Sequence, residues 1–296
     1  MRIGVDVGGT TVKIGIADNK KIIDKFVVVT KKESLFQDIC EGILEHINGK
    51  GYEIEFIGFG LPGHVVDGYI YRLTNVEGIE NVDLRALVHE YFPGVEVGTT
   101  NDANAAALGE ALNDEANPTS SYLLTLGTGV GGGYVVNGRI VDGHHNSTGE
   151  VGHMFIDYVH QYKCNCGLCG CLETVASATG IVRLAREYFD KYETKLDKAT
   201  MSAKDVFDAA KNGDKLGEAV LDMVGMYLGR GLAAIASATD PEVFYIGGGV
   251  SACGQILIDT ISKYYKKYAF YSMKETRITL AKMGNDAGML GAAYIK

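Results

Sequence analysis

One short stretch of the chain concentrates side chains that bind metal ions. Four cysteines, Cys164, Cys166, Cys169 and Cys171, follow His153 closely in the sequence. Zn²⁺ prefers a tetrahedron of thiolate and imidazole ligands, and the glycines between these cysteines allow the tight turns that such a site needs. We expect the ligands to be His153, Cys164, Cys166 and Cys171, with Cys169 competing for one of the four places.

A disulfide framework is the alternative interpretation of four clustered cysteines. The N-terminus lacks the charged segment, apolar segment and cleavage site of a secretory signal, so nothing indicates export to an oxidising compartment. The two remaining cysteines, Cys40 and Cys253, lie far away in apolar surroundings. We therefore favour a metal site in a cytoplasmic protein.

Composition and charge exclude several classes of function. The 296 residues are 46% hydrophobic and 22% charged, which is typical of a soluble globular protein with room for two domains. The net charge of −9 and the lack of a basic stripe argue against nucleic-acid binding. No apolar run approaches the ~20 residues that a membrane-spanning helix needs. We expect no nucleic-acid partner and no membrane partner.

Glycine-rich hairpins occur twice along the chain. Residues 2–29 are typical of three strands, with a Gly-Gly-Thr turn between the first two. Residues 122–141 repeat this pattern with a glycine-rich turn at 127–133 and an Asn-Gly turn at 137–138, the strongest short hairpin signal. Two copies separated by ~120 residues indicate a duplicated architectural unit.

The remaining sequence alternates between helical and strand patterns, which predicts an α/β chain. Strands are expected at 56–60, 95–98 and 243–246, and helices at 34–48, 83–91, 172–191, 202–211, 214–238 and 254–268, with two more opening at 101 and 286. The polar segment 113–121 is the expected linker. We therefore expect a small α/β domain at 1–115, on which a C-terminal helix at 284–296 packs, and a large α/β domain at 116–283 with the zinc-binding loop.

The first hairpin turn has the chemistry of a phosphate-binding loop. Gly8 and Gly9 lack the Cβ atoms that would keep a phosphate away from backbone N–H groups, while Thr10 and Lys13 add a hydroxyl and a cation. Asp6 could hold Mg²⁺ through water. The alternative is a hairpin turn whose polar residues are simply solvated.

Two further glycine clusters could contact a nucleotide. The segment Gly127-Thr128-Gly129-Val130-Gly131-Gly132 formally matches the dinucleotide-binding fingerprint, but that fingerprint requires a helix next and a strand pattern follows, so we reject a Rossmann site. Gly247-Gly248-Gly249 ends a strand and precedes a helix, where a base or ribose could lie against bare backbone. The three loops predict one nucleotide bound between two domains.

Asn101 and Asp102 follow a strand pattern and open a helix. A carboxylate at a helix start usually caps that helix. The alternative is that Asp102 acts as a general base, which takes a proton from a substrate hydroxyl as that hydroxyl attacks the terminal phosphate of ATP.

Six motifs stand in the order found in the ROK sugar kinases, and the chain most closely resembles bacterial ROK glucokinases. The motifs are Asp6-x-Gly-Gly-Thr-x-x-Lys13, Leu61-Pro-Gly63, Asn101-Asp102, Gly127-Thr-Gly-x-Gly-Gly132, Gly149-Glu-x-Gly-His153 and Cys164-x-Cys-Gly-x-x-Gly-Cys-Leu-Glu173. This resemblance spans nearly the whole chain. It implies two actin-like (ribonuclease H-like) domains that close a cleft around ATP and a hexose, in a homodimer.

The resemblance also implies roles for single residues. Asp102 would be the base in the phosphorylation of the 6-hydroxyl of glucose, and the sugar hydroxyls would be held by Asn75, Asn101, Glu150, His153 and Glu173. Zinc on one nitrogen of His153 would fix its ring and leave the other nitrogen for a sugar hydroxyl. Because Cys171 lies two residues from Glu173, one structural ion would orient two sugar ligands.

Some residues depart from the usual family pattern. His64 stands where a proline is common, Thr100 stands where a glutamate is frequent, and the segment 144–148 is more polar than usual. These histidines could be ordinary surface residues, although the loop at 143–149 is expected to border the sugar. The departures leave the hexose open, with fructose, allose, mannose and N-acetylmannosamine as alternatives to glucose.

Two non-enzymatic hypotheses compete with the kinase. A sugar-responsive ROK repressor would carry an additional N-terminal helix-turn-helix domain, whereas this sequence starts one residue before its first expected strand. A catalytically silent sugar-binding protein is the second hypothesis. The presence of Asp102 together with the phosphate loops argues against it.

Overall fold

The computed structural model spans residues 1–296 and describes all of them except residues 75, 77 and 296. The chain forms two compact units, each of which is described by itself. The first comprises Met1–Thr119, Gly133–Thr148 and Met283–Lys296, and the second comprises Ser120–Gly132 and Gly149–Lys282. These units differ from the boundaries expected from the sequence mainly in the hairpin 133–148, which groups with the first unit because it packs on the helix that follows Asn101.

The first unit is built on a five-stranded sheet with the order β3-β2-β1-β4-β8. The β1–β2–β3 meander is antiparallel, while β1, β4 and β8 run parallel. The strands are β1 (Arg2–Val7), β2 (Thr11–Asp18), β3 (Lys21–Val29), β4 (Phe56–Leu61) and β8 (Glu96–Asn101). β1 and β4 are almost wholly buried, as expected for central strands of a sheet covered on both faces.

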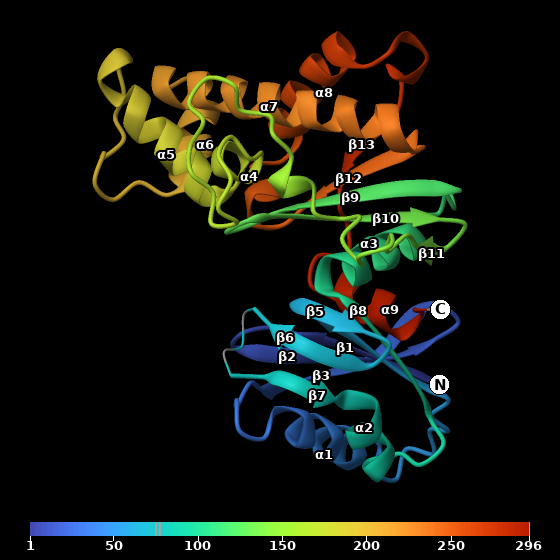
Figure 1. The fold of residues 1–296 in the computed structure, drawn as a ribbon. Helices are drawn as coiled ribbons and strands as arrows, with labels where there is room; N and C mark the ends of the chain where they lie inside the picture. Colours follow the sequence, from blue (N-terminus) through green and yellow to red (C-terminus); the bar gives the residue numbers. More distant parts are fainter. Residues whose placement is uncertain (75, 77, 296) are drawn as a thin grey trace. The chain divides into compact units, whose positions relative to one another are not determined.

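Helices cover both faces of this sheet (Figure 1). α1 (Leu35–Ile47) and α2 (Leu84–Tyr91) share one apolar core with the strands, and α3 (Asp102–Asn113) and α9 (Asp286–Ala293) lie on the other side. Glycines allow α9 to approach very closely: a Cβ at Gly4 would collide with the Met289 carbonyl, and one at Gly58 with the Ala292 carbonyl. The C-terminal helix therefore packs backbone to backbone on the first sheet.

A second, three-stranded sheet in this unit was not expected from the sequence. It consists of β5 (Gly63–Val66), β6 (Tyr69–Leu73) and β7 (Glu80–Asp83), which pair antiparallel. The strands have only four or five residues and mix polar with apolar side chains, so their periodicity is weak. The Asp67-Gly68 turn between β5 and β6, where both residues have positive φ, was the available signal for this hairpin.

The other five-stranded sheet of the protein has the order β11-β10-β9-β12-β13. Its strands are β9 (Ser120–Leu126), β10 (Val130–Val136), β11 (Arg139–Ile140), β12 (Val243–Gly247) and β13 (Arg277–Leu280). An antiparallel hairpin again lies beside parallel strands in the same relative order, so the duplication predicted from the two glycine-rich hairpins is confirmed. Since β10 and no helix follows the loop at 127–129, the rejection of a Rossmann site is also confirmed.

The helices of the second unit are α4 (Glu173–Ala176), α5 (Ala178–Tyr188), α6 (Ala203–Lys211), α7 (Lys215–Thr239) and α8 (Gln255–Tyr268), with short 3₁₀ turns η1 (Val151–His153), η2 (Phe189–Lys191), η3 (Gly249–Cys253) and η4 (Tyr271–Met273). The single helix expected at 172–191 is wrong, because Ser177 is extended and caps α5 by accepting a hydrogen bond from the Gly180 N–H at 3.1 Å.

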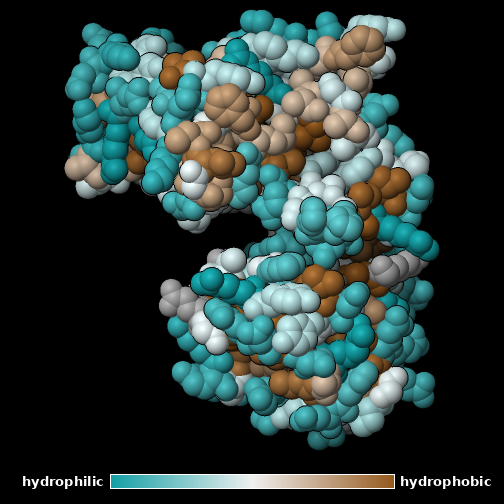
Figure 2. Space-filling view, in the orientation of Figure 1, coloured by the Kyte–Doolittle hydropathy of each residue, from teal (hydrophilic) through white to brown (hydrophobic). Residues whose placement is uncertain are grey.

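α7 is the one described helix that is long and apolar enough to cross a membrane. Its most apolar window is 67% buried inside the protein, which identifies it as a core helix. The face of the molecule shown in Figure 2 is predominantly hydrophilic, with apolar residues dispersed among charged and polar ones.

Candidate active site and metal centre

The turn between β1 and β2 is a tight glycine turn, as the sequence predicted. The Gly8 N–H donates to the Thr11 carbonyl at 3.1 Å, and a Cβ at Gly8 would lie 2.7 Å from that oxygen. Gly9 and Thr10 at its tip are exposed. The turn therefore presents accessible backbone and hydroxyl groups at the end of β1, as phosphate binding requires.

Asp6 and Lys13 face each other at the mouth of this turn. They are register partners in the β1–β2 pair, and the Lys13 Nζ lies 3.7 Å from Asp6 Oδ2 and donates to Asn285 Oδ1 at 3.1 Å. Burial raises the pKa of the Asp6 carboxyl; Lys13 opposes this shift and the negative charge of Asp102 adds to it. The first unit thus gathers two carboxylates and one ammonium group around the turn.

Asp102 is the first residue of α3, and Asn101 is its N-cap. The Ala103 N–H lies 2.9 Å from both Asn101 Oδ1 and Asp102 Oδ1. The cap holds both side chains at the C-terminal end of β8, and Gly60 on β4 leaves room beside the Asp102 Cα. A capping role and a catalytic role are therefore compatible, since only one carboxylate oxygen of Asp102 receives this bond.

The four expected metal ligands come together in the second unit. One ligand atom from each of His153, Cys164, Cys166 and Cys171 lies within 4.8 Å of the others. The His153 Nδ1 is 3.6 Å from Cys164 Sγ, and the Cys166 and Cys171 sulfurs are 3.7 Å apart. Ligands placed tetrahedrally around Zn²⁺ at ~2.3 Å are separated by roughly these distances. Cys169 is exposed and lies outside the cluster.

The pKa values of the cysteine thiols in this cluster are consistent with a site that binds a cation. Burial raises the pKa of the Cys171 thiol to about 12 and also raises that of Cys164, whereas the Leu168 N–H lowers the pKa of Cys166. The protein alone therefore keeps the two buried sulfurs protonated. A divalent cation would reverse this preference, because its charge stabilises coordinating thiolates.

Glu150 and Glu173 flank the metal cluster. The Glu150 Oε2 lies 3.7 Å from His153 Nε2, the ring nitrogen opposite the one that faces Cys164. Glu173 Oε2 accepts from the Val130 N–H at 3.0 Å, and its Oε1 lies 3.7 Å from Cys164 Sγ. Glu150, His153 and Glu173, predicted as sugar ligands, are thus brought together, whereas Asn75 lies outside the described residues.

The second glycine loop is fixed by its neighbours. The Gly127 carbonyl accepts from Ala178 N–H at 2.8 Å, the Thr128 carbonyl accepts from the Thr179 hydroxyl, and a Cβ at Gly129 would collide with the Glu173 carboxylate. Gly131 and Gly132 continue into β10, and a Cβ at Gly132 would lie 2.8 Å from the Val151 side chain. The loop therefore joins the start of α5 to the segment that carries Glu173.

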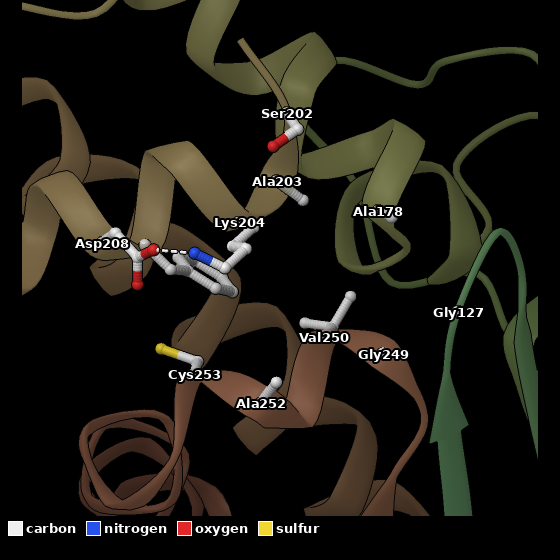
Figure 3. A pocket seen from close by; sticks show the side chains of 11 residues that line it. Gly127, Ala178, Ser202, Ala203, Lys204, Asp208, Gly249, Val250, Ala252 and Cys253 are labelled. Atoms are coloured by element: carbon white, nitrogen blue, oxygen red, sulfur yellow. Dashed lines mark hydrogen bonds and ion pairs between the residues drawn. The ribbon is translucent and has the colours of Figure 1, made fainter.

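A cavity of about 270 Å³ lies beside two of the predicted glycine loops. Gly127 and Gly249 line it, and Figure 3 shows the side chains of α6 and those of η3 on facing sides, with Lys204 turned toward Asp208. Gly247 ends β12, and Gly248 lies between β12 and η3, where a Cβ would collide with the Leu126 backbone. The size and mostly apolar lining suit a flat heteroaromatic group.

Sequence reasoning missed most of this cavity. Its wall on α6 includes Ser202, Lys204, Phe207 and Asp208, and Cys253 lies on η3. These residues form no motif and meet only through packing of α6 beside η3. The one local signal was Ser202, which caps α6 in a capping box with Asp205.

Comparison with known proteins identifies the family. The model of the ROK family matches residues 2–296. Glucokinases from Halalkalibacterium halodurans and Thermotoga maritima are 38% and 36% identical, with 99% of this chain and 94% and 96% of those proteins covered. An N-acetyl-D-glucosamine kinase from Mannheimia succiniciproducens is 32% identical, with 100% and 99% covered.

Solved structures agree with the sequence comparison. A ROK hexokinase from Thermus thermophilus has a TM-score of 0.84 at 32% identity and covers 99% of this chain and 96% of its own. A ROK glucokinase from Streptomyces griseus in complex with glucose and AMPPNP has a TM-score of 0.76 at 29% identity, with 99% and 97% covered. The expected actin-like fold of two α/β domains is thereby confirmed, and the chain belongs to the ROK family, among its sugar kinases.

Proposed function

We propose that this protein is an ATP-dependent glucokinase that phosphorylates the 6-hydroxyl of glucose. The observation that carries this proposal is the position of Asp102 at the start of α3, in electrostatic range of the Asp6–Lys13 turn. Phosphoryl transfer asks a protein for positioning, charge neutralisation and one proton acceptor. In the first unit, the side chains proposed for these three tasks stand on β1, on β2 and at the start of α3.

The roles follow from the chemistry of each group. Asp102 takes the proton of the 6-hydroxyl while the sugar oxygen bonds to the γ-phosphorus of ATP, and the bond from that phosphorus to the β–γ bridging oxygen breaks to release ADP. Lys13 and the Gly8–Gly9 turn offset phosphate charge. Asp6 is the carboxylate suited to hold Mg²⁺ through water, and the ion would supply further charge neutralisation. The cavity beside Gly127 and Gly249 takes the adenine.

The sugar ligands in this proposal are Asn101, Glu150, His153 and Glu173, with Asn75 as a further candidate. Structural Zn²⁺ held by His153, Cys164, Cys166 and Cys171 would fix the His153 ring through Nδ1 and leave Nε2 for a sugar hydroxyl. Glu173, two residues from Cys171, would be oriented by the same ion. The family likeness also favours a homodimer, which sedimentation analysis would test.

A second candidate is an N-acetyl-D-glucosamine kinase of the same mechanism. It is supported by the 32% identical relative that carries this activity. The two activities differ in one substituent, and discrimination depends on which buried polar groups of the site stay paired with the sugar.

The experiment is a coupled ADP-release assay with MgATP and a panel of glucose, N-acetylglucosamine, mannose, fructose, allose and N-acetylmannosamine. Turnover of glucose at a kcat/KM well above that of every other sugar is the expected result. A preference for N-acetylglucosamine would establish the second candidate, and the absence of turnover on the whole panel would favour a sugar-sensing regulator.

A further inference from the structure

A small polar cavity in the first unit lies directly beside Asn101. Its volume is about 100 Å³, larger than one water molecule, and it is walled by the β5–β6 hairpin (63–67), the end of β8 and the segment that contains Asp142 and Asn146. Asn101 lines it and precedes Asp102 in the chain. Of its lining residues, only Asn101 has a part in the function proposed above.

Two buried polar groups in the wall of this cavity have no partner in the structure. Thr100 is 6% exposed and Asn104 is 5% exposed, and the Thr100 Oγ1 and Asn104 Oδ1 make no hydrogen bond. The neighbouring Thr99 differs, because its Oγ1 accepts from the Gly68 N–H at 3.0 Å. A buried polar atom without a partner is destabilising, so a hydrogen-bond donor that reached Thr100 Oγ1 and Asn104 Oδ1 from the cavity would stabilise the protein.

The charge of the cavity selects the chemistry of that ligand. Asp142 and Asp67 line it, and among its described lining residues His64 is the only side chain that can carry a positive charge. The Asn104 Nδ2 lies 3.4 Å from Asp142 Oδ1, and burial raises the pKa of this carboxyl, so the carboxylate gains from a further donor. Carboxylate and amide oxygens accept hydrogen bonds, and they repel phosphates and carboxylates. The cavity therefore suits neutral or positively charged groups that donate hydrogen bonds.

We propose that this cavity is a specificity subsite, in which Thr100 and Asn104 bind a hydroxyl or protonated amine on a sugar carbon other than the one phosphorylated. The inference rests on the proposed sugar kinase, because it is the shared residue Asn101 that links the cavity to the sugar. It predicts that the enzyme prefers sugars with a free hydroxyl or amine at this position. An anionic group there would be repelled by Asp67 and Asp142, and an acylated amine would be too large for a cavity of about 100 Å³, so sugars that carry either group are discriminated against.

The test combines a Thr100→Val variant with a series of 1-, 2-, 3- and 4-deoxyglucose. In the wild-type enzyme, the deoxy sugar that lacks the hydroxyl bound in this cavity should lose about tenfold in kcat/KM, as expected for one lost hydrogen bond. In Thr100→Val the parent sugar should lose a similar factor, through KM, while the penalty for that same deoxy sugar largely disappears. This coupling identifies the carbon whose hydroxyl enters the cavity.

Thr99→Val is the matched control, since it removes a hydroxyl that already has a partner. It should lower the unfolding midpoint by leaving the Gly68 N–H unpaired, and it should preserve the response to each deoxy sugar. Thr100→Val, in contrast, should unfold no earlier than the wild type, because it removes an unpartnered buried hydroxyl. The subsite is overturned if Thr100→Val changes kcat/KM by less than about twofold for every sugar, which would mean that water alone fills the cavity.

Failure of the proposed kinase would be recognised separately. If the wild-type protein turns over no sugar, calorimetric titration with glucose, glucosamine and N-acetylglucosamine replaces the kinetic readout. Binding of glucose or glucosamine that Thr100→Val weakens would uphold the subsite without the kinase. Binding that the variant does not change, or no binding of any of these sugars, would overturn the subsite.

Discussion

The two units use the same order of strands but hold their functional groups in different ways. In the first, Asp6, Lys13 and Asp102 stand on paired strands or at a capped helix start, so the backbone of the sheet fixes them. In the second, Glu150 and His153 lie on the 3₁₀ turn η1 and its approach, within a segment that has only isolated bridges between Phe155 and Cys171 and between Lys163 and Cys169.

This difference explains why a metal cluster occurs in one unit only among the described residues. Paired strands and a capped helix start supply many backbone hydrogen bonds, so a carboxylate placed on them needs no further support. The irregular segment 149–172 also makes backbone hydrogen bonds, such as those from the Ile156 and Asp157 N–H groups to the Gly170 carbonyl, but they form isolated bridges and turns instead of a regular ladder. A metal ion would add a restraint that such a segment lacks. Three cysteines and His153 meeting within 4.8 Å provide the ligands for such a restraint.

The largest effect is expected from Asp102→Asn, which keeps the shape of the side chain and removes the proton acceptor. The kcat should fall by roughly three orders of magnitude, within the usual contribution of a general base. Sugar affinity, metal content and the unfolding midpoint should change little, because the Ala103 N–H can still be capped by Asn101. Stopped-flow or coupled kinetics together with calorimetry would measure this. Turnover within tenfold of the wild type would remove Asp102 as the base.

Removal of the metal should act mainly through the second unit. Chelation, or Cys171→Ser, should weaken sugar binding by about 10–100-fold, as observed when the support of a ligand shell is lost. Elemental analysis and the KM for sugar and ATP measure this, and the KM for ATP should change less, because the Asp6–Lys13 turn contains no metal ligand.

Cys169→Ser is the matched control for the metal cluster, since Cys169 is exposed and outside it. This variant should retain one equivalent of zinc and wild-type kinetics. Loss of zinc from Cys169→Ser, or an unchanged KM for sugar in the zinc-free enzyme, would contradict the comparison between the two units.

A smaller effect is expected from Gly129→Ala. The added Cβ would meet the Glu173 carboxylate and disturb its 3.0 Å bond with the Val130 N–H, so the KM for sugar should rise by about tenfold. At Gly127 a Cβ has open space within 4 Å, and this residue lines the 270 Å³ cavity. Gly127→Ala should therefore alter the KM for ATP more than that for sugar. If both variants changed the KM for sugar and the KM for ATP equally, Gly127 and Gly129 would not have separate roles, and this prediction would be wrong.

The sequence predicted those parts of the molecule in which partners lie close in the chain. The two hairpins followed from glycine turns and apolar runs, and the four ligands of the metal cluster followed from cysteine spacing, since a loop of this length returns on itself. Some of the glycines in these turns also allow a close approach, as Gly129 does for Glu173, whereas others, such as Gly127, have open space around them.

The missed parts depend on packing between distant segments. α6 and η3 form the 270 Å³ cavity although Phe207 and Cys253 belong to no motif. Thr100 and Asn104 were not distinguishable from helix-flanking polar residues, since the lack of a partner is visible only once their surroundings are known. β13 and the β5–β7 sheet were overlooked because their short strands have weak periodicity.

The smallest effect concerns an ion pair between β3 and the end of α1 in which no proposed ligand takes part. Asp24 Oδ2 lies 2.9 Å from His46 Nε2 and 2.6 Å from Lys50 Nζ, and hydrogen bonds from Lys50 and His46 lower its pKa to about 2. A carboxyl whose pKa is depressed in the folded state stabilises the protein above its unfolded pKa of about 4, and this stabilisation is lost as the pH falls toward 2.

Asp24→Asn should therefore lower the free energy of unfolding at pH 7 by less than about 1 kcal/mol, since the pair is partly exposed to solvent. The difference from wild type should shrink between pH 4 and pH 2, and kcat/KM should stay unchanged. Urea unfolding followed by circular dichroism measures it, because the chain has no tryptophan. A difference that persisted at pH 2 would mean that the carboxylate charge is not its source. An accompanying loss of activity would mean that the outer strand of the first sheet also supports Asp6 and Lys13, so that sheet pairing transmits strain to the phosphate turn.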